Sequence, residues 1–232
     1  MFVPDHRPIA LILALRKNGI LDARVLSSIE RTPRELFVAE PFSHQAYDNT
    51  ALPIACGQTI SQPYVVAYAT EALEVGPAML VLEVGTGSGY QAAVLSPLCR
   101  KVYTIERHRP LLREAEARFK ALKLDNIVTK HGDGLKGWSE QAPFDRILLS
   151  AAVDEVPPIL IEQLKPGGIL IAPVGSATNA GLESFSQHLT KMIRTETGLK
   201  REALIPVVFV PMVSGVPQEM RRSNGSSDNG KA

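Results

Sequence analysis

One dense run of the sequence has residue types that suit ligand binding, Glu83-Val84-Gly85-Thr86-Gly87-Ser88-Gly89-Tyr90. Glycines have no Cβ atom, so the backbone can turn tightly there and approach a ligand closely. A helix that starts directly after such a turn offers free N–H groups to a polar ligand. The run therefore indicates binding of a nucleotide-like cofactor, and the alternative is a tight turn without a ligand.

The spacing of Gly85, Gly87 and Gly89 separates two kinds of adenosyl-binding site. A dinucleotide-binding loop has the pattern G-x-G-x-x-G. Its last position falls here on Tyr90, or on Ala92 when counted from Gly87. The observed G-x-G-x-G, with an acidic residue ahead of it, resembles the first motif of Rossmann-like S-adenosylmethionine methyltransferases.

Two further polar signals follow the next two apolar runs. Glu106 ends one run, where a carboxylate can accept hydrogen bonds from both ribose hydroxyls. Asp133, in Gly132-Asp133-Gly134, follows the other and can accept from an adenine amino group, although Gly-Asp-Gly alone is more often a turn. A ribose contact does not distinguish a dinucleotide from S-adenosylmethionine. Signals at three successive strand ends nevertheless indicate an adenosyl site.

The elements that would position these residues alternate between strands and helices from Met79 onward. Nearly continuous apolar runs are typical of buried parallel strands. Predicted strands cover 80–84, 101–106, 127–129, 146–150 and 169–172, the last introduced by the turn 165–168. Predicted helices cover 90–98 and a stretch beginning at Pro110. Antiparallel strands are predicted at 188–195, 199–204 and 206–213. We therefore expect an α/β fold, a doubly wound and mostly parallel Rossmann-like sheet with antiparallel C-terminal strands.

The first part of the chain is predicted to be helical. Helices are expected at 9–17 and 22–31, with Asp22 as an N-cap. Thr32-Pro33-Arg34-Glu35 has the spacing of a capping box ahead of Leu36-Phe37-Val38, and 41–58 is predicted to be an ordered loop. A further helix is expected from Pro63 to Leu73, with Ser61 at or near its N-cap.

Residues 1–213 are predicted to form one domain, with a helical part, 1–75, and an α/β core, 76–213. The polar residues 214–232 are predicted to be a disordered tail, and 176–186 receives no function.

Composition excludes several classes of protein. Twenty-five Lys plus Arg and 24 Asp plus Glu give a net charge of +1, so no overall basic field attracts nucleic acid or an anionic membrane. Cys56 and Cys99 do not suggest a disulfide framework, and the five histidines show no metal-ligand spacing. The apolar stretch 9–15 is too short for a membrane span. We expect a cytoplasmic monomer without metal, nucleic acid or membrane partner. The basic run 107–109 is interpreted as a solvated loop.

Five motifs in order make the chain similar to protein-L-isoaspartate O-methyltransferases. They are Thr59-Ile60-Ser61-Gln62-Pro63, Glu83 to Tyr90, Gly132-Asp133-Gly134, Leu164-Lys165-Pro166-Gly167-Gly168 and Val210-Pro211. The first is the specific one, and the middle three are shared with many methyltransferases. The resemblance implies a repair enzyme that moves a methyl group from S-adenosyl-L-methionine to the free α-carboxyl of an L-isoaspartyl residue. Its substrates would be isoaspartyl-containing proteins and peptides, and its product S-adenosyl-L-homocysteine.

The resemblance also implies roles for individual residues. Ser61 matches the active-site serine, which would orient the substrate carboxylate. Without the resemblance, an N-cap would be the favoured interpretation of Ser61. Substrate would be held by Ser61 together with the backbone of Val210 and Pro211, whereas Val208 stands where bacterial relatives are expected to have arginine. Cofactor contacts are implied for Thr59, Ile60, Ser61, Glu83, Gly85, Thr86, Gly87, Ser88, Gly89, Glu106, Asp133 and Gly134.

Three other functions are compatible with these residues but less favoured. A methyltransferase of the same fold could act on a small molecule or RNA, although the neutral charge disfavours RNA. A non-catalytic adenosyl-binding module is disfavoured by the intact acidic and glycine positions. A dehydrogenase is disfavoured by Tyr90.

Overall fold

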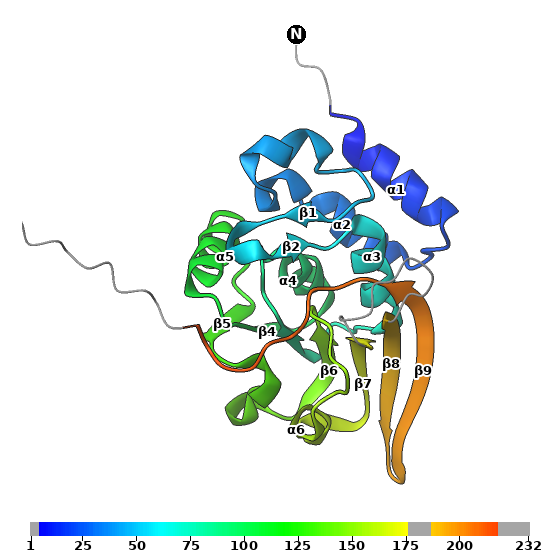
Figure 1. The fold of residues 1–232 in the computed structure, drawn as a ribbon. Coiled ribbons are helices and arrows are strands. Elements are labelled where there is room, and N and C mark those ends of the chain that lie inside the picture. Colours follow the sequence, from blue (N-terminus) through cyan, green and yellow to red (C-terminus); the bar gives the residue numbers. More distant parts are fainter. Residues whose placement is uncertain (1–4, 176–186, 218–232) are drawn as a thin grey trace, which may run out of the picture.

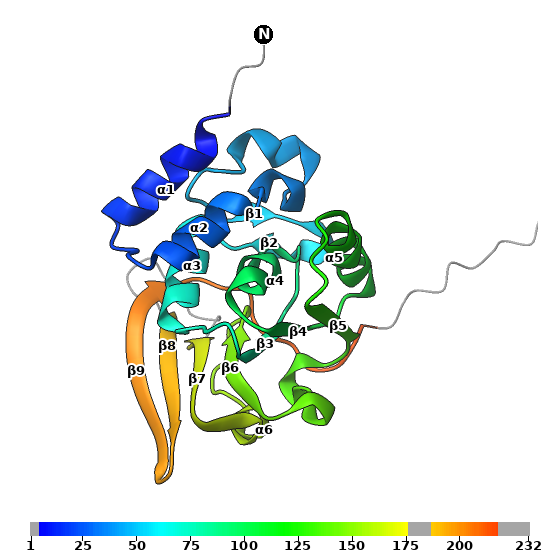
Figure 2. The ribbon, with the colours of Figure 1, turned by 180° about the vertical axis from the view of Figure 1, so that it is seen from behind.

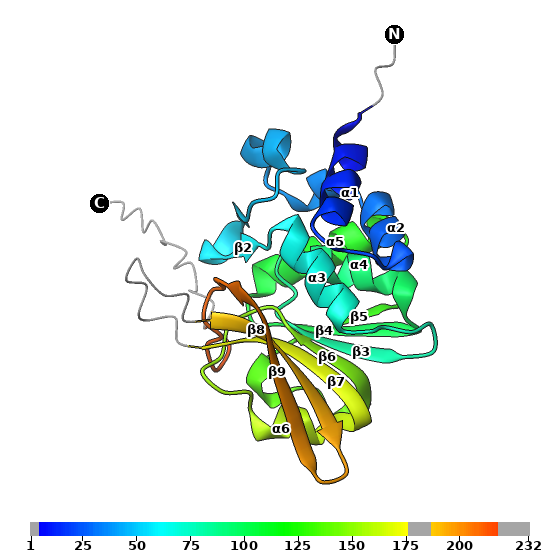
Figure 3. The same ribbon diagram turned by 90° about the vertical axis from the view of Figure 1, so that its right-hand side faces the viewer.

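A seven-stranded sheet crosses the protein, with helices packed on both of its faces (Figures 1 and 3). The computed structural model describes residues 5–175 and 187–217. The segment 176–186 and most of the predicted tail, 218–232, lie outside the described residues.

The sheet is mostly parallel, as predicted. Its strands follow the order β5-β4-β3-β6-β7-β8-β9. Neighbours from β5 to β7 pair in parallel, and β8 and β9 are added antiparallel. The strands are β3 (Leu80–Val84), β4 (Lys101–Glu106), β5 (Ile127–His131), β6 (Phe144–Leu149), β7 (Leu164–Val174), β8 (Gln187–Thr195) and β9 (Gly198–Val207).

Burial of the central strands on both faces explains their continuous apolar sequence. Val81 and Leu82 in β3 are both 0% exposed, yet they belong to different hydrophobic clusters. Successive side chains of a strand point to opposite faces, so each feeds one cluster. Leu82 pairs in register with Tyr103 of β4, which belongs to the same cluster. A strand covered by helices on both sides has no polar face to show in its sequence.

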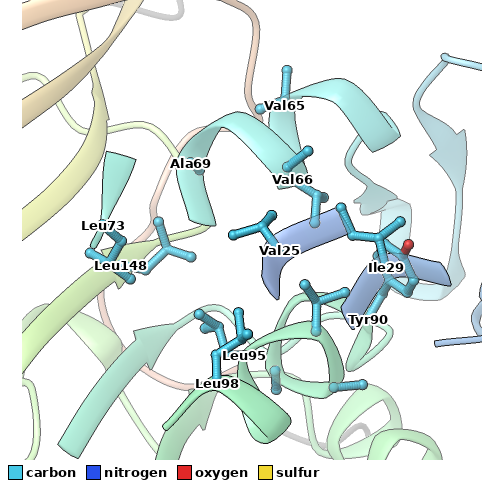
Figure 4. Packing of buried hydrophobic residues seen from close by; sticks show 14 of the residues in the cluster. Val25, Ile29, Val65, Val66, Ala69, Leu73, Tyr90, Leu95, Leu98 and Leu148 are labelled. Carbon is cyan, nitrogen blue, oxygen red and sulfur yellow. The ribbon is translucent and has the colours of Figure 1, made fainter. Parts of the chain in front are cut away.

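Five helices lie on one face of the sheet and a short one on the other (Figures 2 and 3). Side chains of α2, α3 and α4 interdigitate there, with Val25 and Ile29 facing Val66 and Leu95 (Figure 4). Each such buried side chain contributes roughly 1.5–3 kcal/mol, which holds α3 and α4 against α2. The helices on this face are α1 (Arg7–Lys17), α2 (Ala23–Arg31), α3 (Pro63–Ala72), α4 (Tyr90–Leu95) and α5 (Arg109–Ala121), and the one opposite is α6 (Pro158–Glu162).

The predicted capping box is wrong. Thr32 donates its hydroxyl to the carbonyl of Ser28 at 2.8 Å and is the C-cap of α2. The next residues form only a 3₁₀ helix, η1 (Arg34–Phe37), without a side-chain cap. The predicted loop also contains short elements. These are η2 (Glu40–Gln45), β1 (Leu52–Pro53) and η3 (Ala55–Gly57), and β1 pairs with β2 (Thr59–Ile60).

The C-terminal strand prediction is wrong in its second half. β9 ends at Val207, and the residues after it leave the sheet. We call residues 208–217 the C-terminal strap. The predicted turn 165–168 lies instead inside β7, next to a shift of register against β6. Three 3₁₀ helices complete the description, η4 (Ser96–Leu98), η5 (Gly134–Lys136) and η6 (Ser139–Gln141).

Within the described residues, no helix is both long enough and apolar enough to cross a membrane.

Candidate functional site

A pocket opens at the carboxyl ends of β3, β4 and β6. The chain leaves β3 toward β4 on one side and later adds β6 on the other. Open α/β sheets bind their ligands at such a switch point. The predicted residues that line the pocket are Thr59, Ile60, Ser61, Glu83, Gly85, Thr86, Gly87, Ser88, Glu106, Gly134, Val210 and Pro211.

The glycine-rich loop after β3 needs glycine for two reasons. Gly85, Gly87 and Gly89 have φ of 98°, 54° and 90°, in the left-handed region that disfavours side chains. A Cβ at Gly89 would also lie 2.7 Å from Phe119 of α5. Gly89 is thus a packing residue at the start of α4 and does not itself line the pocket.

The Glu106 carboxylate holds the loop against the end of β4. Its Oε2 accepts the N–H of Gly87 at 2.8 Å, and its Oε1 accepts the N–H of His108 at 2.9 Å. Each oxygen keeps a second lone pair, so the carboxylate can also accept from hydroxyl groups of a ligand. Arg107 and His108 line the same wall and are half-buried, so the prediction of a solvated loop is wrong for these two residues.

Glu83 is a fully buried carboxyl group at the floor of the pocket. Its Oε2 accepts the Thr104 hydroxyl at 2.6 Å, and that hydroxyl lies 2.6 Å from the hydroxyl of Thr86. Its Oε1 is buried without a hydrogen-bond partner among the described residues. Burial, with a smaller contribution from the charge of Glu106, raises the pKa of Glu83 to about 8. The site therefore contains an unpaired acidic oxygen that a cationic ligand would stabilise.

Ser61 lies between β2 and α3 and lines the pocket. The N-cap of α3 is Gln62, and the N–H of Tyr64 donates to the Asn49 side chain at 2.9 Å. Ser61 thus lies one residue before the N-cap, within the predicted range, but the prediction that its side chain caps α3 is wrong. Among the described residues the Ser61 hydroxyl has no hydrogen-bond partner, while its backbone carbonyl accepts from Arg34 at 2.8 Å. The hydroxyl is free to bind a ligand.

The C-terminal strap forms the opposite wall. It runs from β9 across the ends of the strands toward β5 (Figure 1). Ala152 donates to the carbonyl of Val210 at 2.8 Å and accepts from Met212 at 2.7 Å. The Gln187 side chain accepts the N–H of Phe209 at 2.7 Å and donates to its carbonyl at 3.3 Å. These contacts hold the strap, while the N–H of Val210 stays unbonded within the described structure.

Asp133 occupies a different position from the one predicted. Its Oδ1 accepts the N–H of Leu135 at 3.0 Å, and its Oδ2 accepts the N–H of Gly215 at 2.8 Å. It fastens the strap beside the pocket and does not line it. Gly215 belongs to the predicted tail, whose first residues are thus in contact with the domain. Val208 is 80% exposed and does not line the pocket.

Three residues that hold segments of the site in place were not predicted from the sequence. Arg34, Asn49 and Gln187 act through hydrogen bonds to segments 27, 15 and 22 residues away in the sequence. The local sequence of Arg34, which lies between Pro33 and the charged Glu35, gives no signal that this side chain is buried. Nothing in the local sequence distinguishes Asn49 or Gln187 from a surface amide.

The chain was compared with families and proteins of known function. A family model described as "Protein-L-isoaspartate(D-aspartate) O-methyltransferase" matches residues 6–217. A protein-L-isoaspartate O-methyltransferase of Paramagnetospirillum magneticum is 57% identical over 215 residues, covering 93% of this chain and 98% of that protein. One of Rhodospirillum rubrum is 56% identical over 219 residues, covering 94% and 97%.

Solved structures of the same family are also similar to this chain. A protein-L-isoaspartate O-methyltransferase structure has a TM-score of 0.76 and 28% identity, and the match covers 88% of this chain and 65% of that one. A structure from Plasmodium falciparum, described as a complex with S-adenosyl-L-homocysteine, has a TM-score of 0.73. Its identity is 24%, with 91% and 99% of the two chains covered, so it supports the fold.

Proposed function

The chain belongs to the protein-L-isoaspartate(D-aspartate) O-methyltransferase family and is an S-adenosylmethionine-dependent enzyme of that kind, and on this premise we propose that the pocket at the switch point carries out the transfer. The accepting group is the free α-carboxyl of an L-isoaspartyl residue in a damaged protein. The observation that carries the proposal is the juxtaposition of an unbonded Ser61 hydroxyl with Glu83 and Glu106 around one pocket.

The residues of the pocket fit the cofactor. The unpartnered Oε1 of Glu83 suits a cationic group, and Glu106 at the end of β4 suits a ribose. The glycine-rich loop leaves open the space that side chains would fill. When bound, S-adenosylmethionine supplies the methyl group from its positively charged sulfonium. Among the remaining predicted contacts, Thr59, Ile60 and Gly134 line the pocket, whereas Gly89 and Asp133 support it from outside.

The chemistry requires little acid–base assistance from the protein. A carboxylate is already ionised and nucleophilic at neutral pH. The Ser61 hydroxyl would donate a hydrogen bond to one carboxylate oxygen and leave the other directed at the methyl group. Positioning of this kind supplies much of the rate in a transfer between two bound groups. Ser61 itself attacks nothing.

Exclusion of water assists the same step. The charges of carboxylate and sulfonium cancel as the methyl moves, so a less polar surrounding favours the transition state. The apolar lining includes Val66 and Leu149, which are 3% and 1% exposed. Ile60, 3% exposed, covers the site from the β2 segment.

Backbone groups of the strap are proposed to hold the substrate peptide. The N–H of Val210 and the carbonyl of Pro211 make no hydrogen bond with any described residue, although their neighbours are fixed to Ala152. An extended peptide can pair with such groups as an added strand does. Because the exposed Val208 lies outside the lining, no role is assigned to its side chain.

The test is methyl transfer to two matched peptides that differ only in isoaspartate or aspartate at one position. Label from S-adenosylmethionine should enter the isoaspartyl peptide alone, as a base-labile ester. Ser61→Ala should lower kcat/KM by roughly tenfold or more, the value of a positioned hydrogen bond to a charged group. Equal transfer to both peptides would contradict the proposed substrate, and an unchanged Ser61→Ala variant would contradict the role of the serine.

We also propose that the enzyme acts as a cytoplasmic monomer, on proteins and peptides and not on nucleic acid or membranes. The near-neutral charge and the two free thiols, exposed Cys56 and buried Cys99, support this. Light scattering of the purified protein should give a mass near 25.2 kDa. A stable dimer would contradict it.

A further inference from the structure

Arg34 makes an unusual set of contacts behind the pocket. It is the largest fully buried side chain among the described residues, at 0% exposure. Its Nε donates to the carbonyl of Ala46 at 2.8 Å, and its Nη2 donates to the carbonyl of Ser61 at 2.8 Å. Its Cζ lies 4.7 Å from the centre of the Tyr90 ring. One side chain thus joins three segments that are distant in the sequence.

Packing alone does not account for an arginine at this position. In the described part of the chain no carboxylate lies within ion-pair distance of Arg34, and its Nη1 is buried without a partner. Burial lowers the pKa of Arg34, and the nearby Tyr90 only partly opposes this. A buried charge without a counter-ion is destabilising, and an apolar side chain of similar volume would avoid this cost. The rigid fork of donors is what a guanidinium adds.

The contact with Ser61 is made where the backbone has few other restraints. The β1–β2 ladder that precedes Ser61 consists of two residue pairs. After Ser61 the chain turns into α3 at Pro63, which has no N–H to donate. The hydrogen bond from Arg34 is therefore a principal restraint on the peptide plane of Ser61.

The face of the same guanidinium packs against the first residue after the glycine-rich loop. Tyr90 is the first residue of α4, directly after Gly89, and its ring packs against the guanidinium. A cation over an aromatic face is attracted by the ring, and more strongly when both are removed from water. Through Arg34, the Ser61 backbone is thereby held at a fixed position relative to the loop that is proposed to bind the cofactor.

We propose that Arg34 is a positioning residue for methyl transfer, which fixes the Ser61 backbone relative to the glycine-rich loop so that the Ser61 hydroxyl meets the substrate carboxylate. The inference rests on the proposed role of Ser61. Arg34 does not line the pocket, whereas Ser61 and Tyr90 do, so it acts through these two residues.

A double-mutant cycle tests the inference with Arg34→Lys, Ser61→Ala and the combination. Lysine keeps the charge but lacks the fork. Arg34→Lys should lower kcat for the isoaspartyl peptide by roughly ten- to a hundredfold. Its Kd for S-adenosylhomocysteine should stay within about threefold of the wild type, because no cofactor contact is removed. Arg31→Lys, the same change at an exposed position of α2, is the matched control and should have no effect.

The combination distinguishes positioning from general damage to the fold. In the Ser61→Ala background, Arg34→Lys should cost less than about threefold, because no hydroxyl remains to be misplaced. Equal losses in both backgrounds would overturn the inference. A variant that fails to fold or loses S-adenosylhomocysteine binding together with transfer would assign Arg34 to the fold alone and overturn it as well. If Ser61→Ala alone transfers like the wild type, the assigned role of Ser61 fails instead.

Discussion

The buried carboxyl group of Glu83 predicts a pH dependence of stability that can be isolated by one substitution. Its pKa rises from 4.5 to about 8 in the folded, cofactor-free protein. Between these values the unfolded state has lost the proton and the folded state keeps it. The unfolded state thus binds fewer protons, so the stability contributed by Glu83 is complete below pH 4.5 and is lost as the pH rises toward 8.

The size of this change in stability follows from the difference in bound protons between the folded and unfolded states. Each pH unit inside this window changes the free energy of unfolding by about 1.4 kcal/mol. From pH 5.5 to 7.5 the wild type should therefore lose about 2–3 kcal/mol relative to Glu83→Gln, which has no proton to release. Of the groups that act on Glu83, Glu106 is the charged one, and Thr104 and Ser150 are neutral.

Urea unfolding of both proteins at three pH values, without cofactor, measures the difference. Other titrating groups contribute equally to both proteins and cancel in the comparison. Parallel curves for wild type and Glu83→Gln would refute the reasoning, because they would mean that Glu83 ionises in the folded state as it does in the unfolded state. A difference that grows with pH but vanishes when S-adenosylhomocysteine is bound would show that its ammonium group holds Glu83 ionised.

Three further outcomes are expected. Gly89→Ala should lower the free energy of unfolding, measured in urea, by roughly 2–4 kcal/mol. The reason is that position 89 has a left-handed φ of 90° and that the new Cβ would lie 2.7 Å from Phe119. Phe119→Leu should recover part of this loss, and an unchanged stability of Gly89→Ala would contradict the close packing. Gln187→Leu should raise KM for the isoaspartyl peptide by roughly three- to tenfold, because it removes both hydrogen bonds to Phe209. If Kd for S-adenosylhomocysteine rose by a similar factor, the strap would serve the cofactor instead. Glu106→Gln should weaken S-adenosylhomocysteine binding by roughly tenfold in calorimetry, since one charged acceptor is lost; unchanged binding would exclude Glu106 as a ribose contact.

Local sequence predicts the parts of this fold that local physics determines. The strand at 80–84 and the one at 101–106 were predicted with the observed bounds, because burial on both faces leaves an uninterrupted apolar run. Glu106 was placed at the pocket for the same reason, since the ends of parallel strands share one edge. The capping box at Thr32 failed because a competing acceptor, the carbonyl of Ser28, lies one turn back in α2.

The remainder of the site depends on contacts between distant segments. No local pattern shows that Asp133 accepts from Gly215, 82 residues further along, and so faces the strap. The free hydroxyl of Ser61 likewise depends on Asn49, which takes over the start of α3. Residues that act through tertiary hydrogen bonds carry no periodicity, and the structure is needed to find them.

The C-terminal strap has a consequence for how such a site can change over generations. Its proposed substrate contacts are the N–H of Val210 and the carbonyl of Pro211, and its attachment to Ala152 is also through main-chain atoms. Every residue type carries the same main-chain atoms, with proline lacking only the N–H. Most substitutions along the strap therefore leave the recognition groups in place, so neutral drift is tolerated there. With the proposed contacts, recognition through main-chain atoms would also let one enzyme accept a damaged residue in many different sequence surroundings.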